Sequence, residues 1–167
     1  FELFNPPTEN KLQSPPNLEW EKWAENEFGN AFLGDPRRTD RLIKIASWRA
    51  AKPSDSLPQC FDNKAKLKAA YHFYDNPGIN REAILTSHYL ATPERLSTEN
   101  LVLAVSETTE IDYSHHQSKK GLGYWHDLNP HGLLWHSTWV VTPAKVPLGL
   151  LDQPIIYRDI DHFGKKH

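Results

Sequence analysis

Apolar residues recur at helical spacing through the first hundred positions, with proline, glycine and asparagine between the segments. The pattern predicts four helices, at about residues 18–32, 35–52, 63–74 and 80–90. Asp35-Pro36 is typical of a helix start, because aspartate accepts the free backbone N–H groups and proline fits the first turn. Pro93 either ends the last helix or begins a short extra turn. Residues 54–61 predict a loop, and the proline-rich residues 1–17 predict an extended arm.

After Asn100 the pattern changes to short apolar runs rich in β-branched residues, which predict strands. The runs are at about residues 101–105, 133–141 and 146–151, and residues 155–157 extend the last one. A loop over 121–132 and a turn over 142–145 separate them, so we expect an antiparallel meander. The predicted fold class is therefore α+β, a helical part followed by three antiparallel strands.

A meander of three strands has an apolar face and open edges to cover, and it rarely makes a domain alone. The chain also contains no methionine and starts at Phe1. We therefore expect it to be a truncated part of a longer protein.

Composition narrows the classes of function. The chain has 167 residues, 38% of them hydrophobic, and no apolar run long enough to span a bilayer. Cys60 is the only cysteine, which excludes an internal disulfide and a multi-cysteine zinc site and fits a reducing compartment. These features predict a cytoplasmic protein without membrane contact.

The net charge of −2 hides a segregation along the chain. Residues 1–35 contain seven acidic and two basic residues, whereas residues 36–72 contain nine basic and three acidic residues. A basic block of this kind is typical of a phosphate-binding surface. The alternative is a solvated, lysine-rich helix face.

Four motifs, in order along the chain, resemble the bacterial cut-and-paste DDE transposases of the transposon-five type, the insertion-sequence-four family. The first is Leu33-Gly-Asp-Pro-Arg-Arg-Thr-Asp-Arg-Leu, and the second is Ala70-Tyr-His-Phe-Tyr-Asp-Asn-Pro. The third is Leu103-Ala-Val-Ser-Glu-Thr-Thr-Glu-Ile-Asp-Tyr. The fourth joins Gly132-Leu-Leu-Trp-His-Ser with Gly149-Leu-Leu-Asp-Gln.

The resemblance implies a domain organisation and a partner. It implies a helical DNA-binding domain over residues 18–98, and the first strands of an incomplete ribonuclease H-like catalytic domain over 99–167. The partner is double-stranded DNA at a transposon end, bound for transposition and DNA recombination, in a bacterial protein associated with the nucleoid when on DNA. The resemblance also implies a possible homodimer on DNA in the full-length protein.

The same resemblance implies an acidic triad that binds two divalent cations, Mg²⁺ or Mn²⁺, for DNA cleavage and strand transfer. Glu107 occupies the position where the family has the first aspartate, as a catalytic residue and metal ligand or as the remnant of a decayed site. The second and third acids are expected beyond His167. We therefore expect this chain to lack catalysis alone and to need no cofactor.

Six basic residues are the candidate DNA contacts: Arg37, Arg38, Arg41, Lys52, Lys64 and Lys68. Arginine and lysine bind phosphates by charge, with counterion release. The arginines lie near a helix start. Solvent-exposed helix side chains are the alternative for every one of the six.

Aromatic and histidine residues are expected to be structural. We expect Trp20, Trp23, Phe28, Phe32, Tyr71 and Tyr74 to lie in the core rather than to stack on bases. His115, His116, His126, His131 and His136 have strand and loop spacing without an i, i+4 pair on a helix, and we expect no metal site there. The resemblance places His136 at a family position inside a strand, where it is expected to be structural. An alternative function is a non-catalytic DNA-binding regulator or a domesticated remnant of a transposase, and a third possibility is a decayed product without function.

Overall fold

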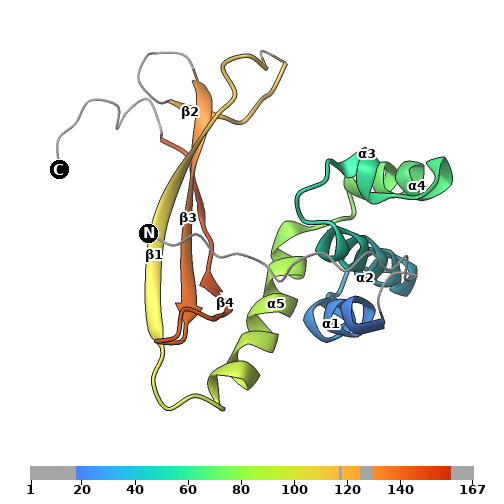
Figure 1. The fold of residues 1–167 in the computed structure, drawn as a ribbon. Helices are drawn as coiled ribbons and strands as arrows, with labels where there is room; N and C mark the ends of the chain where they lie inside the picture. Colours follow the sequence, from blue (N-terminus) through green and yellow to red (C-terminus); the bar gives the residue numbers. More distant parts are fainter. Residues whose placement is uncertain (1–17, 117, 125–129, 159–167) are drawn as a thin grey trace. The chain divides into compact units, whose positions relative to one another are not determined.

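The computed structural model describes residues 18–116, 118–124 and 130–158 (Figure 1). The chain forms two compact units, and the boundary between them falls between Ser87 and His88. The expected extended arm over residues 1–17 lies outside the described residues. The first unit is helical in its described part and the second is built around a β-sheet, which agrees with the predicted α+β class.

Four helices and the first half of a fifth form the first unit. They are α1 (Leu18–Phe28), α2 (Pro36–Ala51), α3 (Leu57–Cys60), α4 (Lys64–Tyr74) and α5 (Arg81–Leu96). Asp35 caps α2 by accepting a hydrogen bond from the Arg37 backbone N–H, and Asn63 caps α4 by accepting one from Lys66.

The core of the first unit collects apolar side chains from the α1–α2 connection, α2, α3 and α4. Its buried members are Ala31, Leu33, Leu42, Ile45, Cys60, Phe61, Ala70 and Phe73. Trp48 of α2 packs edge-on against Phe61, with ring centroids 5.1 Å apart. The Ser87 hydroxyl of α5 donates to the Glu27 carbonyl of α1 at 2.9 Å, so a buried hydrogen bond joins the last helix of this unit to its first.

The second unit contains an antiparallel sheet centred on β3. Its strands are β1 (Leu103–Asp112), β2 (Gly123–Tyr124), β3 (Pro130–Val141), β4 (Pro147–Asp152) and β5 (Ile155–Ile156). β1 pairs with β3 along its whole length, from Leu103 opposite Val141 to Asp112 opposite Gly132. β4 pairs with β3, as do the two short strands.

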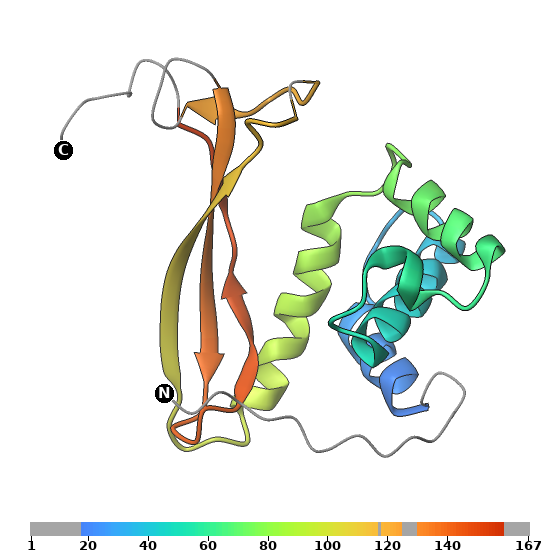
Figure 2. The ribbon, with the colours of Figure 1, turned by 45° about the horizontal axis from the view of Figure 1, so that its top comes forward.

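The second half of α5 lies beside β4 (Figure 2), and three side chains on one helical face hold it there. The Thr92 hydroxyl donates to the Leu150 carbonyl at 3.3 Å, and His88 Nε2 accepts from the Leu150 N–H at 3.0 Å. Arg95 donates to the Leu148 carbonyl. Gly149 permits this approach, because a Cβ there would lie 2.3 Å from Thr92 Oγ1 and its φ is +152°.

Several predicted boundaries are wrong. The first helix ends at Phe28 rather than near residue 32, and the expected loop over 54–61 contains α3, opened by a Ser56–Gln59 capping box. α5 continues through Pro93 to Leu96, and the hydrogen bonds of its second half to β4 support these turns. β1 extends to Asp112, because its pairing with β3 outweighs the polar composition of its second half.

Candidate nucleic-acid interface

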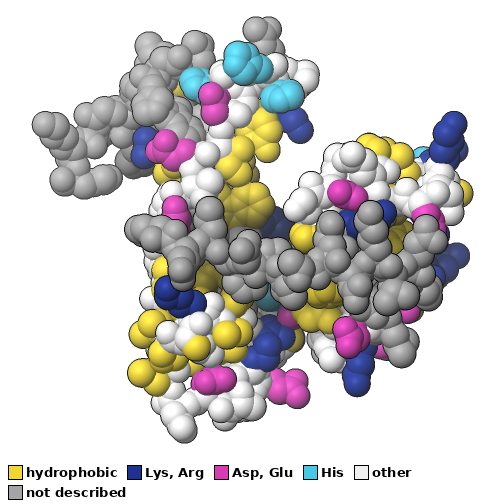
Figure 3. All heavy atoms as spheres, viewed as in Figure 1, with side chains coloured by type: hydrophobic (Ala, Val, Ile, Leu, Met, Phe, Trp, Pro, Cys, Tyr) yellow, Lys and Arg dark blue, Asp and Glu magenta, His cyan; other side chains and the backbone are white. Residues whose placement is uncertain are grey.

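The exposed face of α4 presents a row of basic side chains. Lys64, Lys68 and His72 are spaced by four residues, which places them one above another on a helix. All three are exposed, and none forms a hydrogen bond or ion pair with the described part of the chain. Tyr71, 46% exposed, lies beside His72 in sequence. Lys and Arg side chains are visible at the position of α4 in Figure 3. We call Lys64, Lys68, Tyr71 and His72 the α4 face.

Lys66 lies on the same helix but has internal partners. Its ammonium is 2.7 Å from an Asp62 carboxylate oxygen and 5.0 Å from the centre of the Trp48 ring. A hydrogen bond from Lys66 lowers the pKa of Asp62, which stays ionised. Of the three alternating lysines, Lys64 and Lys68 therefore have no internal partner in the described part of the chain, whereas Lys66 has two.

Arg37, at the start of α2, is exposed but is paired with the residue that caps its own helix. Its guanidinium lies 2.8 Å from Asp35 Oδ2, and its backbone N–H donates to Asp35 Oδ1 at 2.9 Å. The side-chain hydrogen bond from Arg37, with the backbone one, lowers the pKa of Asp35 to about 2. Asp35 in turn raises the pKa of Arg37. The arginine is accessible, and its charge is offset by an adjacent carboxylate.

Arg38 and Arg41 differ from Arg37 in burial and in contacts. Arg38 is half-buried, and its Nη1 donates to the carbonyls of Leu33 at 2.8 Å and Gly78 at 3.4 Å. It thereby joins the segment before α2 to the turn before α5. Arg41 is half-buried and has no hydrogen bond or ion pair to the described residues.

Lys52 caps the C-terminal end of α2, and its ammonium donates to the Gln59 carbonyl at 3.2 Å. Arg49, one turn earlier, donates to the Asp55 carbonyl at 2.5 Å, and its Nη1 lies 3.0 Å from Cys60 Sγ. These cations hold the α2–α3 connection, and Lys52 remains exposed. Among the six predicted contacts, Lys64 and Lys68 are thus exposed without an internal partner.

A hollow of about 410 Å³ lies in the first unit beside the α1–α2 connection. Its lining includes the carboxylates of Glu25, Asp35 and Asp40 and the ring of Phe32. Negative side chains around this hollow repel phosphate, so it is the opposite of an interface for nucleic acid. The exposed lysines of α4 are therefore better candidates for phosphate contacts than the residues that line this hollow.

Glu107 lies on β1, exposed, with Ser137 of β3 opposite. Its neighbours on the strand form cross-strand hydrogen bonds, Ser106 with Thr138 and Thr108 with His136. Two-cation chemistry needs several converging carboxylates. In the described ranges no three His, Cys, Asp or Glu side chains come together to hold a metal ion. The described residues therefore do not fit a two-cation site.

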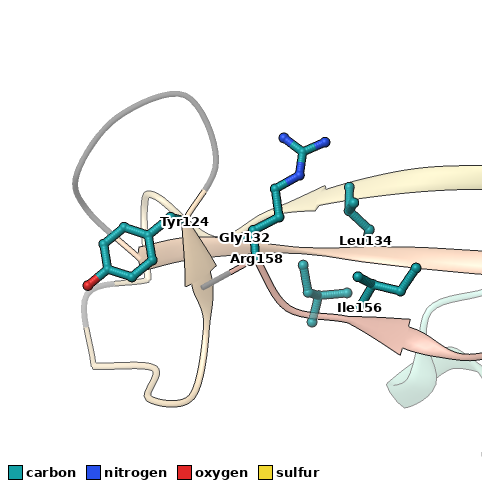
Figure 4. A pocket seen from close by; sticks show the side chains of 6 residues that line it. Tyr124, Gly132, Leu134, Ile156 and Arg158 are labelled. Carbon is teal, nitrogen blue, oxygen red and sulfur yellow. The ribbon is translucent and has the colours of Figure 1, made fainter. Parts of the chain in front are cut away.

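The histidines give no metal centre within the residues described. His136 accepts or donates a hydrogen bond with Thr108 at 2.7 Å, which agrees with a structural role, and His126 lies outside the described residues. A recess in the sheet unit lies between Tyr124, Leu134 and Arg158 (Figure 4). It contains no space for a water molecule.

The expected burial of aromatic side chains is wrong at several positions. Phe32 is 85% exposed, and Tyr71 and Tyr74 are about half exposed, as are the tryptophans of α1 to a smaller extent. Helical spacing alone placed Tyr71 on the apolar face of α4, whereas the buried face is formed by Ala70 and Phe73. His72 was missed as a site residue, although its spacing from Lys64 and Lys68 was visible in the sequence.

No helix in the described ranges is both long and apolar enough to cross a membrane. Residues 20–79 match the family model described as transposase DNA-binding. The match covers about a third of the chain, includes α2, α3 and α4, and contains all six predicted DNA contacts. This helical part of the chain is therefore similar to the DNA-binding domains of transposases.

Proposed function

We propose that the helical unit binds double-stranded DNA through the α4 face. The observation that carries this proposal is the pair Lys64 and Lys68, exposed and without internal partners, inside the segment that matches transposase DNA-binding domains. Ammonium groups without an internal partner keep their charge available for phosphates. An α-helix also fits the width of the major groove of B-form DNA.

The geometry of the α4 face suits contacts to the DNA backbone. Residues four apart on a helix are neighbours, so Lys64, Lys68 and His72 form a continuous line of donors. Tyr71 adds a half-exposed ring with a hydroxyl group beside that line. Phosphate contacts of this kind fix position and orientation without reading the base sequence.

The finer assignment is also a proposal. The Gly-Asp-Pro-Arg-Arg stretch and the family match support recognition of transposon-end DNA by a protein of the insertion-sequence-four family. The antiparallel order of β1, β3 and β4 supports the start of a ribonuclease H-like core. For a longer protein containing this chain, we propose a requirement for Mg²⁺ or Mn²⁺ and a homodimer on DNA.

A second candidate is a DNA-binding regulator that does not cut DNA. The isolated position of Glu107 opposite Ser137 favours it. The test is incubation of the chain with supercoiled plasmid and Mg²⁺ or Mn²⁺, with Glu107→Gln alongside. An unchanged plasmid in every lane is the expected result. Nicking by the wild-type chain that Glu107→Gln abolishes would overturn this candidate.

Fluorescence anisotropy with duplex DNA across a salt series tests the main proposal. The logarithm of the DNA-binding constant falls linearly with the logarithm of the salt concentration, and each phosphate contact that is removed makes this slope less steep by about 0.9. We expect Lys64→Gln/Lys68→Gln to reduce the slope by about 2. The matched control is Lys22→Gln/Lys145→Asn, which removes the same charge from exposed positions elsewhere and should leave the slope unchanged.

Two results would contradict the proposal. One is the absence of binding at low salt by a chain whose circular dichroism shows helix and sheet. The other is an equal loss of slope in the α4 variant and in the control, which would indicate attraction by net charge rather than a defined surface.

A further inference from the structure

The loop between β1 and β2 gathers a second set of basic side chains, in the sheet unit. His115, His116, Lys119 and Lys120 are all exposed. Figure 3 shows histidine side chains grouped at one end of this unit, next to a Lys or Arg side chain. The four residues lie outside the segment that matches transposase DNA-binding domains. They are also separate from the α4 face in sequence and in unit.

The ring of Tyr113 organises this loop. His116 packs against it with ring centroids 6.0 Å apart, and the Lys119 ammonium lies 5.7 Å from its centre. The His116 N–H donates to the Tyr113 carbonyl, and the Lys119 N–H donates to the His116 carbonyl. The Tyr113 N–H donates to the His131 carbonyl of β3, which fixes the loop to the sheet. Tyr113, paired with β3 through its backbone, therefore has both His116 and Lys119 against its ring.

Asp112 is the acidic residue at the base of the loop, and its carboxylate already has partners. It accepts hydrogen bonds from the Ser114 backbone N–H at 2.7 Å and from the Ser114 hydroxyl at 3.0 Å. These bonds lower the pKa of Asp112, and the charges of His131 and His115 lower it further. The carboxylate of Asp112 is thus held by Ser114, next in sequence to a loop with two lysines and two exposed histidines.

Protonation of the histidines changes the charge of the loop several-fold. With His115 and His116 neutral, the two lysines and Asp112 leave a net charge of +1, and protonation of both histidines raises it to +3. Histidine is the side chain whose charge ordinarily changes between about pH 5 and 8. The other described titratable groups around the pair are Tyr113 in the loop and His131 on β3.

We propose that His115, His116, Lys119 and Lys120 form a second contact for the DNA phosphate backbone, which strengthens as the two histidines become protonated. This inference rests on the proposed function, binding of duplex DNA by the chain. It adds a binding surface in the sheet unit and a dependence on pH that the α4 lysines do not supply. The ligand chemistry is the diester phosphate of duplex DNA.

The test compares the whole chain with His115→Gln/His116→Gln by fluorescence anisotropy at pH 7.5 and pH 5.5, each across a salt series. Glutamine keeps a polar side chain of similar length and removes the titration. The expected change is a salt slope that steepens by about 2 more in the wild-type chain than in the variant when the pH falls. His72 and the remaining histidines are present in both proteins, so their contribution cancels in the difference.

A second variant separates the lysines from the histidines. Lys119→Gln/Lys120→Gln should reduce the salt slope at both pH values and retain the steepening at low pH. Circular dichroism of each variant should match that of the wild-type chain, because all four side chains are exposed.

The outcomes distinguish this inference from the function on which it rests. Binding with the same pH-dependent steepening in the wild-type chain and His115→Gln/His116→Gln would overturn the loop as a contact and leave DNA binding by α4 standing. No binding at either pH would overturn the proposed function itself. Binding whose additional steepening at pH 5.5 disappears with the two histidines supports the inference.

Discussion

The two basic stretches of the helical unit, at the start of α2 and along α4, have similar composition, but they differ in how many of their cations have internal partners. Arg37 is paired with Asp35, and Arg38 donates to two backbone carbonyls. Lys64 and Lys68 contact no charged or polar partner in the described part of the chain. The number of basic residues in a segment therefore does not indicate how many are available to a ligand. Availability depends on the internal partners of each cation.

The largest expected effect is on stability, at Arg38. Arg38→Ala removes hydrogen bonds to the Leu33 and Gly78 carbonyls. The segment before α2 and the turn before α5 then lose the side chain that joins them. The bond to Leu33 is 2.8 Å long and the exposed bond to Gly78 is 3.4 Å long, so the first contributes most. A hydrogen bond that involves a charged group contributes about 1.5–3 kcal/mol, and we therefore expect a loss of about 2 kcal/mol in the free energy of unfolding. Urea denaturation measures it. An unfolding midpoint equal to that of the wild-type chain would show that Arg38 has no structural role.

The next effect is on DNA affinity, at α4. Lys64→Glu/Lys68→Glu reverses two charges that hold no internal contact, and we expect affinity for duplex DNA to fall on the order of 10-fold or more at moderate salt. Stability in urea should stay within about 0.5 kcal/mol of wild type, since the positions are exposed. Anisotropy and denaturation on the same samples measure the two quantities. A large loss of stability in Lys64→Glu/Lys68→Glu would show that these lysines, like Arg38, support the fold.

A smaller effect is the pH dependence contributed by Asp35. Its pKa is about 2 in the folded chain, below the ordinary value of 3.8, because Arg37 donates to its carboxylate. A lowered folded-state pKa stabilises the fold above the ordinary value, and this contribution is lost as the pH falls from about 4 to about 2. Denaturation at a series of pH values should show this loss, and Asp35→Asn should reduce it. An identical pH profile for Asp35→Asn would mean that the pair with Arg37 does not persist in solution.

The smallest effect separates Lys66 from Lys68. Lys66 is held between Asp62 and the Trp48 ring, so Lys66→Gln should change the DNA affinity less than Lys68→Gln does. The two variants lose the same charge two residues apart, which makes each the control of the other. Anisotropy at one low salt concentration is sufficient. If Lys66→Gln has the larger effect, internal partners do not decide which lysines bind.

Local pattern predicted the elements well where a cap or a turn marks their ends. Asp35-Pro36 and Asn63 begin α2 and α4 as expected, and the turn over 142–145 separates β3 from β4. The errors lie where distant partners decide. β1 continues through a polar stretch because β3 supplies a partner for every residue, and α5 continues past Pro93 where its side chains hold β4.

The candidate site was predicted in part, for a related reason. The basic charge of residues 36–72 lies within the segment that matches transposase DNA-binding domains, and the lysine spacing on α4 follows from helix geometry alone. The distinction between Arg37 and Arg38 was not predictable, because the Gly78 carbonyl is forty residues away from Arg38 in sequence. Which aromatic rings are exposed likewise depends on packing between helices, as at Tyr71.

The lack of internal partners on the α4 face has a consequence for how such a domain can evolve. Residues 64, 68 and 72 are free to change as long as they remain compatible with a helix, because no carbonyl or carboxylate of the described fold depends on them. Arg38 does not have this freedom, nor does Gly149, where any side chain would meet Thr92. Single substitutions can therefore change the charge of this surface, while the scaffold beneath it stays the same.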